Sequence, residues 1–116
     1  MRVFRDTLAM NTVYADIEPA RAEIDALEGP AVIEFGTPWC GYCRATQPLL
    51  AKALSSRPNV RHIKIEDGSG RRLGRSFGVK LWPTLVFLLA GKEVARLVRP
   101  TDSNAIDRAL SQIDVA

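Results

Sequence analysis

Cys40 and Cys43 are the residues of this chain whose types and spacing best suit chemistry, and the 116-residue sequence contains no other cysteine. Their spacing closes so small a loop that a disulfide between them would add little stability through chain entropy. A Cys-x-x-Cys pair of this kind is typical of redox chemistry or of metal binding. A closed zinc site needs four ligands, and His62 is the one further soft ligand. The sequence therefore favours redox chemistry and predicts no metal.

A helix that begins at the cysteines would place both sulfurs on one face. With Cys40 at the first turn and Cys43 one turn along, the sulfurs come within disulfide range. The positive end of the helix dipole would favour a thiolate on Cys40. Cys40 would then attack a substrate disulfide, and the more buried Cys43 would resolve the mixed disulfide.

The neighbouring sequence predicts the strand and the helix that this geometry requires. Residues 31–35 form a short apolar, β-prone run after the turn signal Gly29-Pro30. Apolar residues recur at helical spacing after Cys43, and residues 55–58 end that helix. Pro48 lies inside the helix and should kink it. The cysteines thus fall at a strand-to-helix junction, where the sites of open sheets gather.

Two segments carry a family resemblance. Residues 35–43 read Phe-Gly-Thr-Pro-Trp-Cys-Gly-Tyr-Cys, and residues 79–87 read Val-Lys-Leu-Trp-Pro-Thr-Leu-Val-Phe. Together with Pro48, they resemble the active-site helix and the cis-proline segment of the thioredoxin family. The resemblance implies an α/β, thioredoxin-like fold with a central mixed β-sheet flanked by helices on both faces. It also implies a thiol-disulfide oxidoreductase that reduces or exchanges protein disulfides, without a bound cofactor.

The rest of the chain predicts elements in an order that suits this fold. The expected elements are a helix at 19–27, a strand at 59–66, a helix at 71–77, antiparallel strands at 84–89 and 94–98, and a final helix capped by residues 101–103. Residues 13–116 would form the domain. Residues 1–12 show no clear period and would form an N-terminal arm or an extra strand.

Glu34 stands six residues before Cys40 on the expected buried strand. Thioredoxins carry a buried Asp there that acts as the proton acceptor for the resolving cysteine, and the resemblance implies the same role for Glu34. Burial should raise the pKa of this carboxyl toward neutral pH. The alternative is a Glu34 side chain that points to solvent. His62 either faces Glu34 and titrates with it, or lies on the surface after a one-residue shift of register.

The resemblance also implies a substrate groove around the cysteines. Pro83 would be cis and leave the backbone of Trp82 free to pair with an extended substrate segment. The Trp82 indole either narrows this groove or only packs. Arg99 stands where thioredoxins usually present a Gly, and it either favours acidic partners or lies in solvent. The residues assigned to the groove are Trp39, which shields the site, with Gly41, Tyr42, Trp82, Pro83 and Arg99.

Tyr42 leaves alternative functions open. Thioredoxins typically have Gly-Pro between the cysteines, and this dipeptide tunes the reduction potential. The tetrapeptide Cys-Gly-Tyr-Cys resembles many glutaredoxins, so a glutathione-coupled exchange is one alternative. A non-enzymatic interaction module of the same fold is another, and an iron–sulfur cluster bridging two subunits through Cys40 is a remote third.

Composition limits the partners. The net charge of +3 is too small to indicate nucleic-acid binding, and no aromatic residues interleave with the basic cluster at residues 71–75. The longest central apolar stretch, residues 85–90, is far too short to cross a membrane. The first residues lack the apolar segment of a secretory signal, which favours the cytoplasm. The expected partners are disulfide-containing proteins and a reductase or thiol pool, and the expected state is a monomer.

Overall fold

A four-stranded mixed sheet in the order β2-β1-β3-β4 is the middle layer of the computed structural model, which describes residues 10–115. Its strands are β1 (Pro30–Gly36), β2 (Arg61–Glu66), β3 (Thr84–Leu89) and β4 (Lys92–Val98). Strand β1 pairs in parallel with β2 and antiparallel with β3, and β3 pairs antiparallel with β4. The predicted mixed sheet is confirmed.

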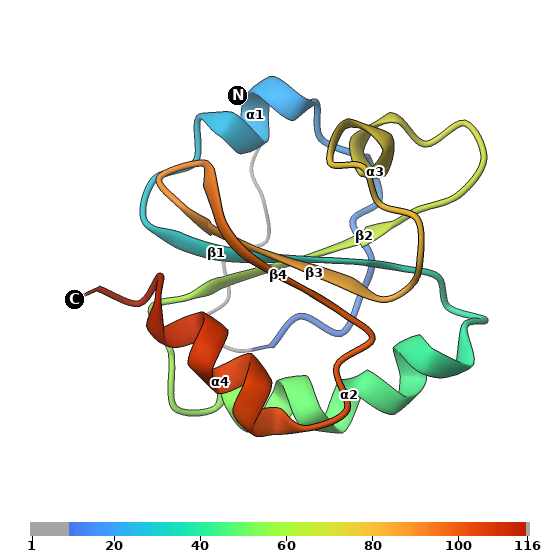
Figure 1. Cartoon of the computed structure of the whole chain (residues 1–116). Helices are drawn as coiled ribbons and strands as arrows, with labels where there is room; N and C mark the ends of the chain where they lie inside the picture. Colours follow the sequence, from blue (N-terminus) through green and yellow to red (C-terminus); the bar gives the residue numbers. More distant parts are fainter. Residues whose placement is uncertain (1–9, 116) are drawn as a thin grey trace.

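Helices cover both faces of this sheet, as predicted (Figure 1). Helices α1 (Arg21–Asp25) and α3 (Arg72–Ser76) lie over one face, and α2 (Gly41–Leu54) and α4 (Ser103–Ser111) lie over the other. The fold is therefore a three-layer α/β arrangement, with the cysteine-bearing helix α2 beside α4.

Side-chain alternation along β1 assigns its residues to the two faces. Ala31, Ile33 and Phe35 pack into the apolar cluster under α1 and α3. Val32 packs into the second cluster, under α2 and α4. Glu34 lies two residues beyond Val32, so the strand directs this buried carboxyl toward helix α2 rather than toward solvent.

Several predicted boundaries differ from those in the structure. Helix α1 begins only at Arg21, because Ala20 is its N-cap and the side chain of Glu23 accepts a hydrogen bond from the Ala20 N–H at 2.9 Å. Strand β2 begins at Arg61, because the Val60 N–H is used in a turn, where it donates to the carbonyl of Arg57. Strand β4 begins at Lys92, two residues earlier than predicted.

The predicted N-terminal arm is described only in part. Residues 1–9 lie outside the described residues. Met10 packs against the cluster under α2 and α4, and the Asn11 N–H donates to His62 Nδ1 at 2.8 Å. Farther along, the Ala15 N–H donates to the carbonyl of Lys64 in β2 at 2.9 Å. The segment before α1 therefore contacts the strand that carries His62 and Lys64.

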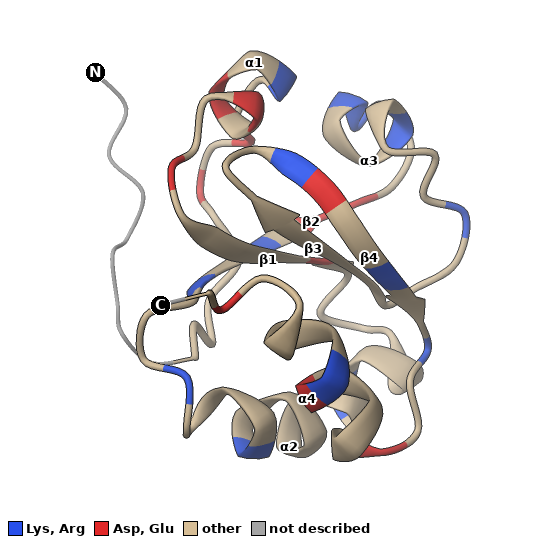
Figure 2. Cartoon of the chain, turned by 60° about the vertical axis from the view of Figure 1, so that its left-hand side comes forward, with Lys and Arg blue, Asp and Glu red and all other residues tan. Residues whose placement is uncertain are grey.

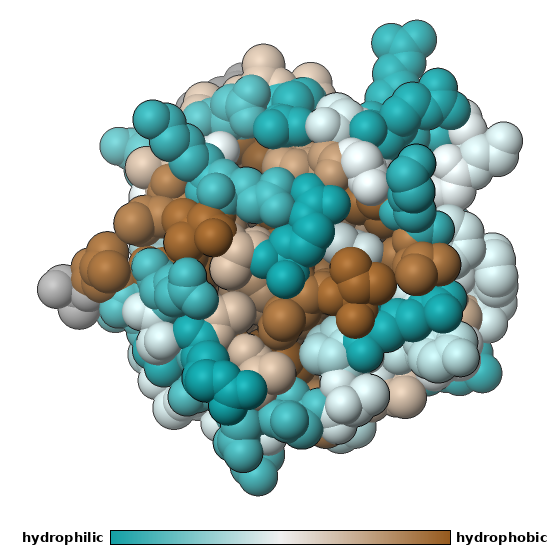
Figure 3. Space-filling view, viewed as in Figure 1, coloured by the Kyte–Doolittle hydropathy of each residue, from teal (hydrophilic) through white to brown (hydrophobic). Residues whose placement is uncertain are grey.

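Strand β4 is an edge of the sheet and carries charged side chains that protect such an edge from pairing with another chain. Lys92 and Glu93 are exposed, and Arg96 binds Glu93 at 2.7 Å. Figure 3 shows hydrophilic side chains crossing the apolar surface of this side of the molecule. The strand ends at Val98, directly before Arg99.

Candidate active site

The two cysteines lie at the start of helix α2, as predicted. Cys40 is the N-cap residue, with an extended backbone, and its Sγ accepts a hydrogen bond from the Cys43 N–H at 3.2 Å. Both are free thiols. The Cys40 residue is 8% exposed, whereas Cys43 is 2% exposed and lies one turn inside the helix. This arrangement leaves Cys40 nearer to solvent and keeps Cys43 within reach of it.

Cys43 sits in a tight site below the helix start. A Cβ atom on Gly36 would lie 2.6 Å from Cys43 Sγ, so only glycine fits at the end of β1. Burial raises the pKa of the Cys43 thiol to about 12, and the neighbouring Cys40 sulfur and the Glu34 charge add to this rise. The Cys43 sulfur is therefore a protonated thiol at neutral pH.

Alkylation of the reduced, folded protein at neutral pH is expected to modify Cys40 and leave Cys43 almost unlabelled. Thiolates are the species that react, and the Cys43 thiol is both buried and protonated. Mass spectrometry of the labelled peptides measures the two rates. In denaturant both cysteines should react at similar rates, which provides the control. Equal labelling in the folded protein would contradict this account of Cys43.

Glu34 belongs to a buried polar cluster with three partners beneath the cysteines. Its Oε1 lies 2.9 Å from His62 Nε2, and its Oε2 accepts a hydrogen bond from Gln47 Nε2 at 2.7 Å. Lys64 Nζ lies 3.4 Å from the same Oε2 and donates to Gln47 Oε1 at 2.8 Å. Glu34 and Lys64 are direct neighbours in the parallel β1–β2 register. The cluster thus joins both strands to helix α2.

The backbone of Asn11 fixes the tautomer of His62. Because the Asn11 N–H donates to His62 Nδ1, that nitrogen carries a lone pair and no proton. The proton of a neutral imidazole then lies on Nε2, which donates to Glu34 Oε1. The geometry matches an ionised carboxylate that accepts hydrogen bonds from His62 and Gln47 beside the Lys64 ammonium.

The expected rise in the pKa of Glu34 is wrong. Burial by itself raises the pKa of this carboxyl, but the His62 hydrogen bond and the Lys64 charge lower it further than burial raises it. Glu34 is therefore ionised at neutral pH. The prediction that His62 faces Glu34 is confirmed, and the surface alternatives for both residues are wrong.

Lys64 and Gln47 were not identified from the sequence. Lys64 alternates with Ile63 and Ile65 along β2, and this alternation could have placed it on the same face as His62. Gln47 stands one helical turn after Cys43, and its Nε2 also donates to the Cys43 carbonyl at 2.7 Å. No local pattern marks Gln47, because its side-chain partners Glu34 and Lys64 come from two other elements.

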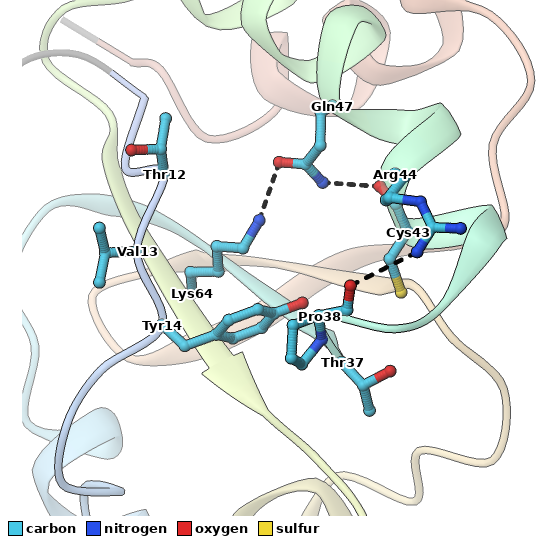
Figure 4. Close-up of a pocket in the computed structure, with 9 residues that line it drawn as sticks. All are labelled: Thr12, Val13, Tyr14, Thr37, Pro38, Cys43, Arg44, Gln47 and Lys64. Carbon is cyan, nitrogen blue, oxygen red and sulfur yellow. Dashed lines mark hydrogen bonds between the residues drawn. The ribbon is translucent and has the colours of Figure 1, made fainter.

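A pocket of about 340 Å³ opens beside Cys43 on this side of the molecule (Figure 4). The Gln47 amide links Lys64 to the carbonyl of Cys43 across the pocket wall. The Tyr14 ring lies under Lys64, with Nζ 4.8 Å from the ring centroid. The lining residues are Thr12, Val13, Tyr14, Thr37, Pro38, Cys43, Arg44, Gln47 and Lys64. Gln47 and Lys64 of the polar cluster therefore line a pocket that does not include Cys40.

On the other side, the Trp82–Pro83 peptide faces Cys40. This peptide bond is cis, as predicted, and the Trp82 carbonyl oxygen lies 3.9 Å from Cys40 Sγ. The Trp82 indole donates to Asp67 Oδ2 at 2.8 Å and packs edge-on against Trp39, with ring centroids 5.6 Å apart. Trp39 itself is 68% exposed. The two indoles therefore form an apolar wall beside the sulfurs.

Arg99 lies against Trp82 and Tyr42 rather than in open solvent. Its Nε donates to the Trp82 carbonyl at 2.9 Å, and its guanidinium carbon lies 4.0 Å from the centroid of the Tyr42 ring. Tyr42 and Gly41 are exposed in the first turn of α2. Of the residues assigned to a groove from the sequence, Trp82 thus lies beside Cys40, and Arg99 joins Trp82 to Tyr42.

These features are those of a protein that catalyses thiol-disulfide exchange. Two thiols at a helix start, both buried but with Cys40 the more exposed of the two, can cycle between dithiol and disulfide by exchange with another disulfide. The described residues contain no group of three or more His, Cys, Asp or Glu side chains that could hold a metal ion. In the part of the chain that the structure describes, no helix is long and apolar enough to span a membrane.

Comparison with known proteins supports this class and identifies the family. The thioredoxin family model matches residues 14–112. A thioredoxin from Chlamydia muridarum is 31% identical over 84 residues, which cover 72% of this chain and 82% of that protein. The reduced form of thioredoxin 2 from Pseudomonas aeruginosa PAO1 superposes with a TM-score of 0.81 at 56% identity, covering 90% of this chain and 97% of that one. The chain belongs to the thioredoxin family.

The predicted function is therefore confirmed at the level of the family: the protein is a thiol-disulfide oxidoreductase that reduces protein disulfides. A further relative, thioredoxin H-type 1 of Nicotiana tabacum, is 36% identical over 67 residues, which cover 58% of this chain and 53% of that protein. These matches do not favour the glutaredoxin alternative.

Proposed function

We propose that Cys40 is the attacking thiolate and Cys43 the resolving thiol in the reduction of protein disulfides. The observation that carries this assignment is the position of the two sulfurs, with Cys40 at the N-cap facing the groove and Cys43 buried behind it. An attacking thiolate must reach its substrate, whereas a resolving thiol has only to reach the first cysteine.

The cycle balances as two successive exchanges. The Cys40 thiolate attacks one sulfur of the substrate disulfide, a mixed disulfide forms, and the other substrate sulfur leaves as a thiolate that takes up a proton. Cys43 then gives its proton to Glu34 and attacks the Cys40 sulfur, and the second substrate sulfur leaves as a thiolate that takes up this proton. The substrate gains two electrons, and the Cys40–Cys43 pair becomes a disulfide. A reductase or a thiol pool returns two electrons, and one proton restores the Cys43 thiol beside the Cys40 thiolate.

Glu34 is the proposed proton acceptor for Cys43. Its carboxylate is ionised at neutral pH and raises the pKa of the Cys43 thiol, so the thiol keeps its proton in the resting state. Formation of the mixed disulfide consumes the Cys40 thiolate, whose charge and hydrogen bond also raise the pKa of Cys43. The pKa of Cys43 therefore falls when its attack is required.

The exposed groove is the proposed substrate surface. The backbone of Trp82, next to cis-Pro83, would pair with an extended segment of the substrate, and Trp39, Gly41 and Tyr42 would contact it across the helix start. The edge-on packing of Trp39 on Trp82 supports this role, because it holds an exposed apolar ring beside Cys40. We place the protein in the cytoplasm as a monomer that receives electrons from a reductase or a thiol pool.

A trapping experiment tests the order of the two cysteines. In the Cys43→Ser variant, the mixed disulfide between Cys40 and a substrate protein cannot be resolved, so a covalent complex should accumulate. Non-reducing electrophoresis detects it, and dithiothreitol should release it. The Cys40→Ser variant should trap nothing. Accumulation with Cys40→Ser and none with Cys43→Ser would reverse the assignment.

A further inference from the structure

The Trp82 carbonyl, which faces Cys40 in the groove, already carries a hydrogen bond from within the protein. Arg99 Nε donates to this oxygen at 2.9 Å, and the oxygen lies 3.9 Å from Cys40 Sγ. In the proposed function, on which this inference rests, an extended substrate segment pairs with the backbone of Trp82. A substrate N–H must therefore compete with Arg99 for the same acceptor.

Arg99 is held over the groove at several points. Its backbone N–H donates to the Pro83 carbonyl at 3.0 Å, and its guanidinium stacks above the Tyr42 ring at 4.0 Å. Its φ angle of 50° is in the left-handed region, which costs free energy for any residue with a Cβ. The chain thus keeps an arginine at a position whose backbone suits glycine, and this arginine covers the substrate-pairing carbonyl.

The positive charge of Arg99 has no acidic partner among the described residues. No described Asp or Glu side chain lies within ion-pair distance of its guanidinium, and Nε alone of its side-chain nitrogens has a hydrogen-bond partner in residues 10–115. A guanidinium in this state can still form a two-pronged pair with a carboxylate. A carboxylate that enters the groove would therefore bind Arg99 more strongly than a neutral carbonyl does.

The opposite side of Trp82 is also basic. A pocket of about 360 Å³ beside the indole is lined by Arg71, Arg75 and Lys80, and by the single acidic residue Asp67. Asp67 is already engaged by the Trp82 indole. Figure 2 shows basic residues on α3 and on β4. Basic side chains thus flank both sides of the Trp82–Pro83 segment.

We propose that Arg99 is a specificity-determining residue that selects disulfides flanked by Asp or Glu. A carboxylate beside the reactive substrate cysteine would pair with the Arg99 guanidinium and draw it away from Trp82. The carbonyl then becomes free to accept the substrate N–H. A neutral substrate must break the Arg99–Trp82 hydrogen bond without this compensation, and a cationic substrate is also repelled.

Three disulfide peptides that differ only in a Glu, Gln or Lys beside the reactive cysteine test this proposal. We expect the reduced protein to react fastest with the Glu peptide, about tenfold faster than with the Gln peptide at low salt, and slowest with the Lys peptide. Added salt should diminish the Glu preference. Rapid mixing with the reduced protein, followed by quenching and separation of the peptides, gives the rates.

Variants of Arg99 separate the effect of its positive charge from the effect of its hydrogen bond to the Trp82 carbonyl. The glycine of Arg99→Gly suits the left-handed backbone, so this variant should fold normally. Because it lacks the positive charge, it should react with the Glu and Gln peptides at equal rates. Because the Trp82 carbonyl is no longer occupied, it should react with the Gln peptide faster than wild type does. Arg99→Lys keeps the charge but lacks the planar fork, so it should keep a reduced Glu preference. Arg108→Ala, at an exposed position on α4, is the control and should behave as wild type.

The possible results distinguish the proposed selectivity of Arg99 from the disulfide reduction by Cys40 on which it rests. Equal wild-type rates with the Glu and Gln peptides, with reduction still dependent on Cys40, would overturn the selection by Arg99 and leave the reductase function intact. A slower reaction of Arg99→Gly with the Gln peptide would overturn the covering role. Failure of the wild type to reduce any of the three peptides would overturn both.

Discussion

Replacing Cys40 with serine is expected to abolish disulfide reduction, with a loss of about 10³-fold or more to the rate measured without protein. A serine hydroxyl stays protonated at neutral pH and cannot form a disulfide, so neither the mixed disulfide nor the Cys40–Cys43 disulfide can arise. Cys43 cannot take over the attack, because it is 2% exposed and its thiol pKa is raised to about 12. Turnover of a protein disulfide with excess dithiothreitol measures the loss.

The fold should survive this substitution. Serine is nearly the size of cysteine, and its hydroxyl can accept the same hydrogen bond from the Cys43 N–H at the start of α2. Thermal unfolding of the reduced Cys40→Ser variant should therefore stay close to that of wild type. Arg108→Ala supplies a variant with normal turnover. Residual turnover by folded Cys40→Ser at the wild-type rate would refute Cys40 as the nucleophile.

Replacing Glu34 with alanine is expected to lower the free energy of unfolding by about 3–5 kcal/mol. The substitution leaves the Lys64 ammonium buried without its carboxylate, and it removes the acceptor of the His62 Nε2 proton. In the described part of the chain, the Lys64 ammonium keeps its hydrogen bond to Gln47 Oε1 and its contact with the Tyr14 ring, but no carboxylate. Unfolding in urea, monitored by tryptophan fluorescence, gives the difference.

Glu28→Ala is the matched control, because Glu28 is an exposed carboxylate outside the buried cluster and away from the cysteines in the sequence. Its free energy of unfolding should change by less than about 0.5 kcal/mol. A loss in Glu34→Ala no larger than that of the control would show that the buried cluster does not stabilise the fold.

The acid side of the stability profile tests the direction of the Glu34 shift. Because the pKa of Glu34 is lowered in the folded protein, its ionisation stabilises the fold above the unfolded pKa of about 4.3, and this stabilisation is lost as the pH falls through the folded pKa. Stability should therefore fall more steeply at acid pH in wild type than in Glu34→Gln. A raised pKa would reverse the sign, and stability would then increase as the pH falls toward 4.3.

Much of the site could be predicted because its signals are local in the sequence. The spacing of Cys40 and Cys43 fixes their relation on one helix turn, and the strand-to-helix junction fixes where that helix begins. Glu34 could be placed on β1 by its distance from Cys40, but its pKa depends on Lys64 and His62, which lie about thirty residues away. Burial alone predicts a raised pKa for Glu34, which has the wrong sign because His62 and Lys64 lower it.

Contacts between distant side chains could not be predicted. The position of Arg99 in the sequence shows that it follows β4. Its hydrogen bond to the Trp82 carbonyl depends on a left-handed backbone at Arg99, which the sequence does not mark with a glycine. Periodicity and turn residues predict the order of strands and helices along the chain, whereas the thioredoxin-like fold was implied by the family resemblance. The ends of α1 and β2 were not, because single turn hydrogen bonds determine them.

The reduction potential of the Cys40–Cys43 couple tests the central claim most directly. Equilibration of the protein against defined thiol buffers, with the thiol and disulfide forms separated after quenching, gives this potential. A reductant of protein disulfides should have a two-electron potential near about −270 mV. A potential of about −200 mV or above would instead indicate glutathione-linked or oxidising chemistry and identify Tyr42 as its source. The absence of any two-electron couple would contradict the enzymatic function and support an interaction module.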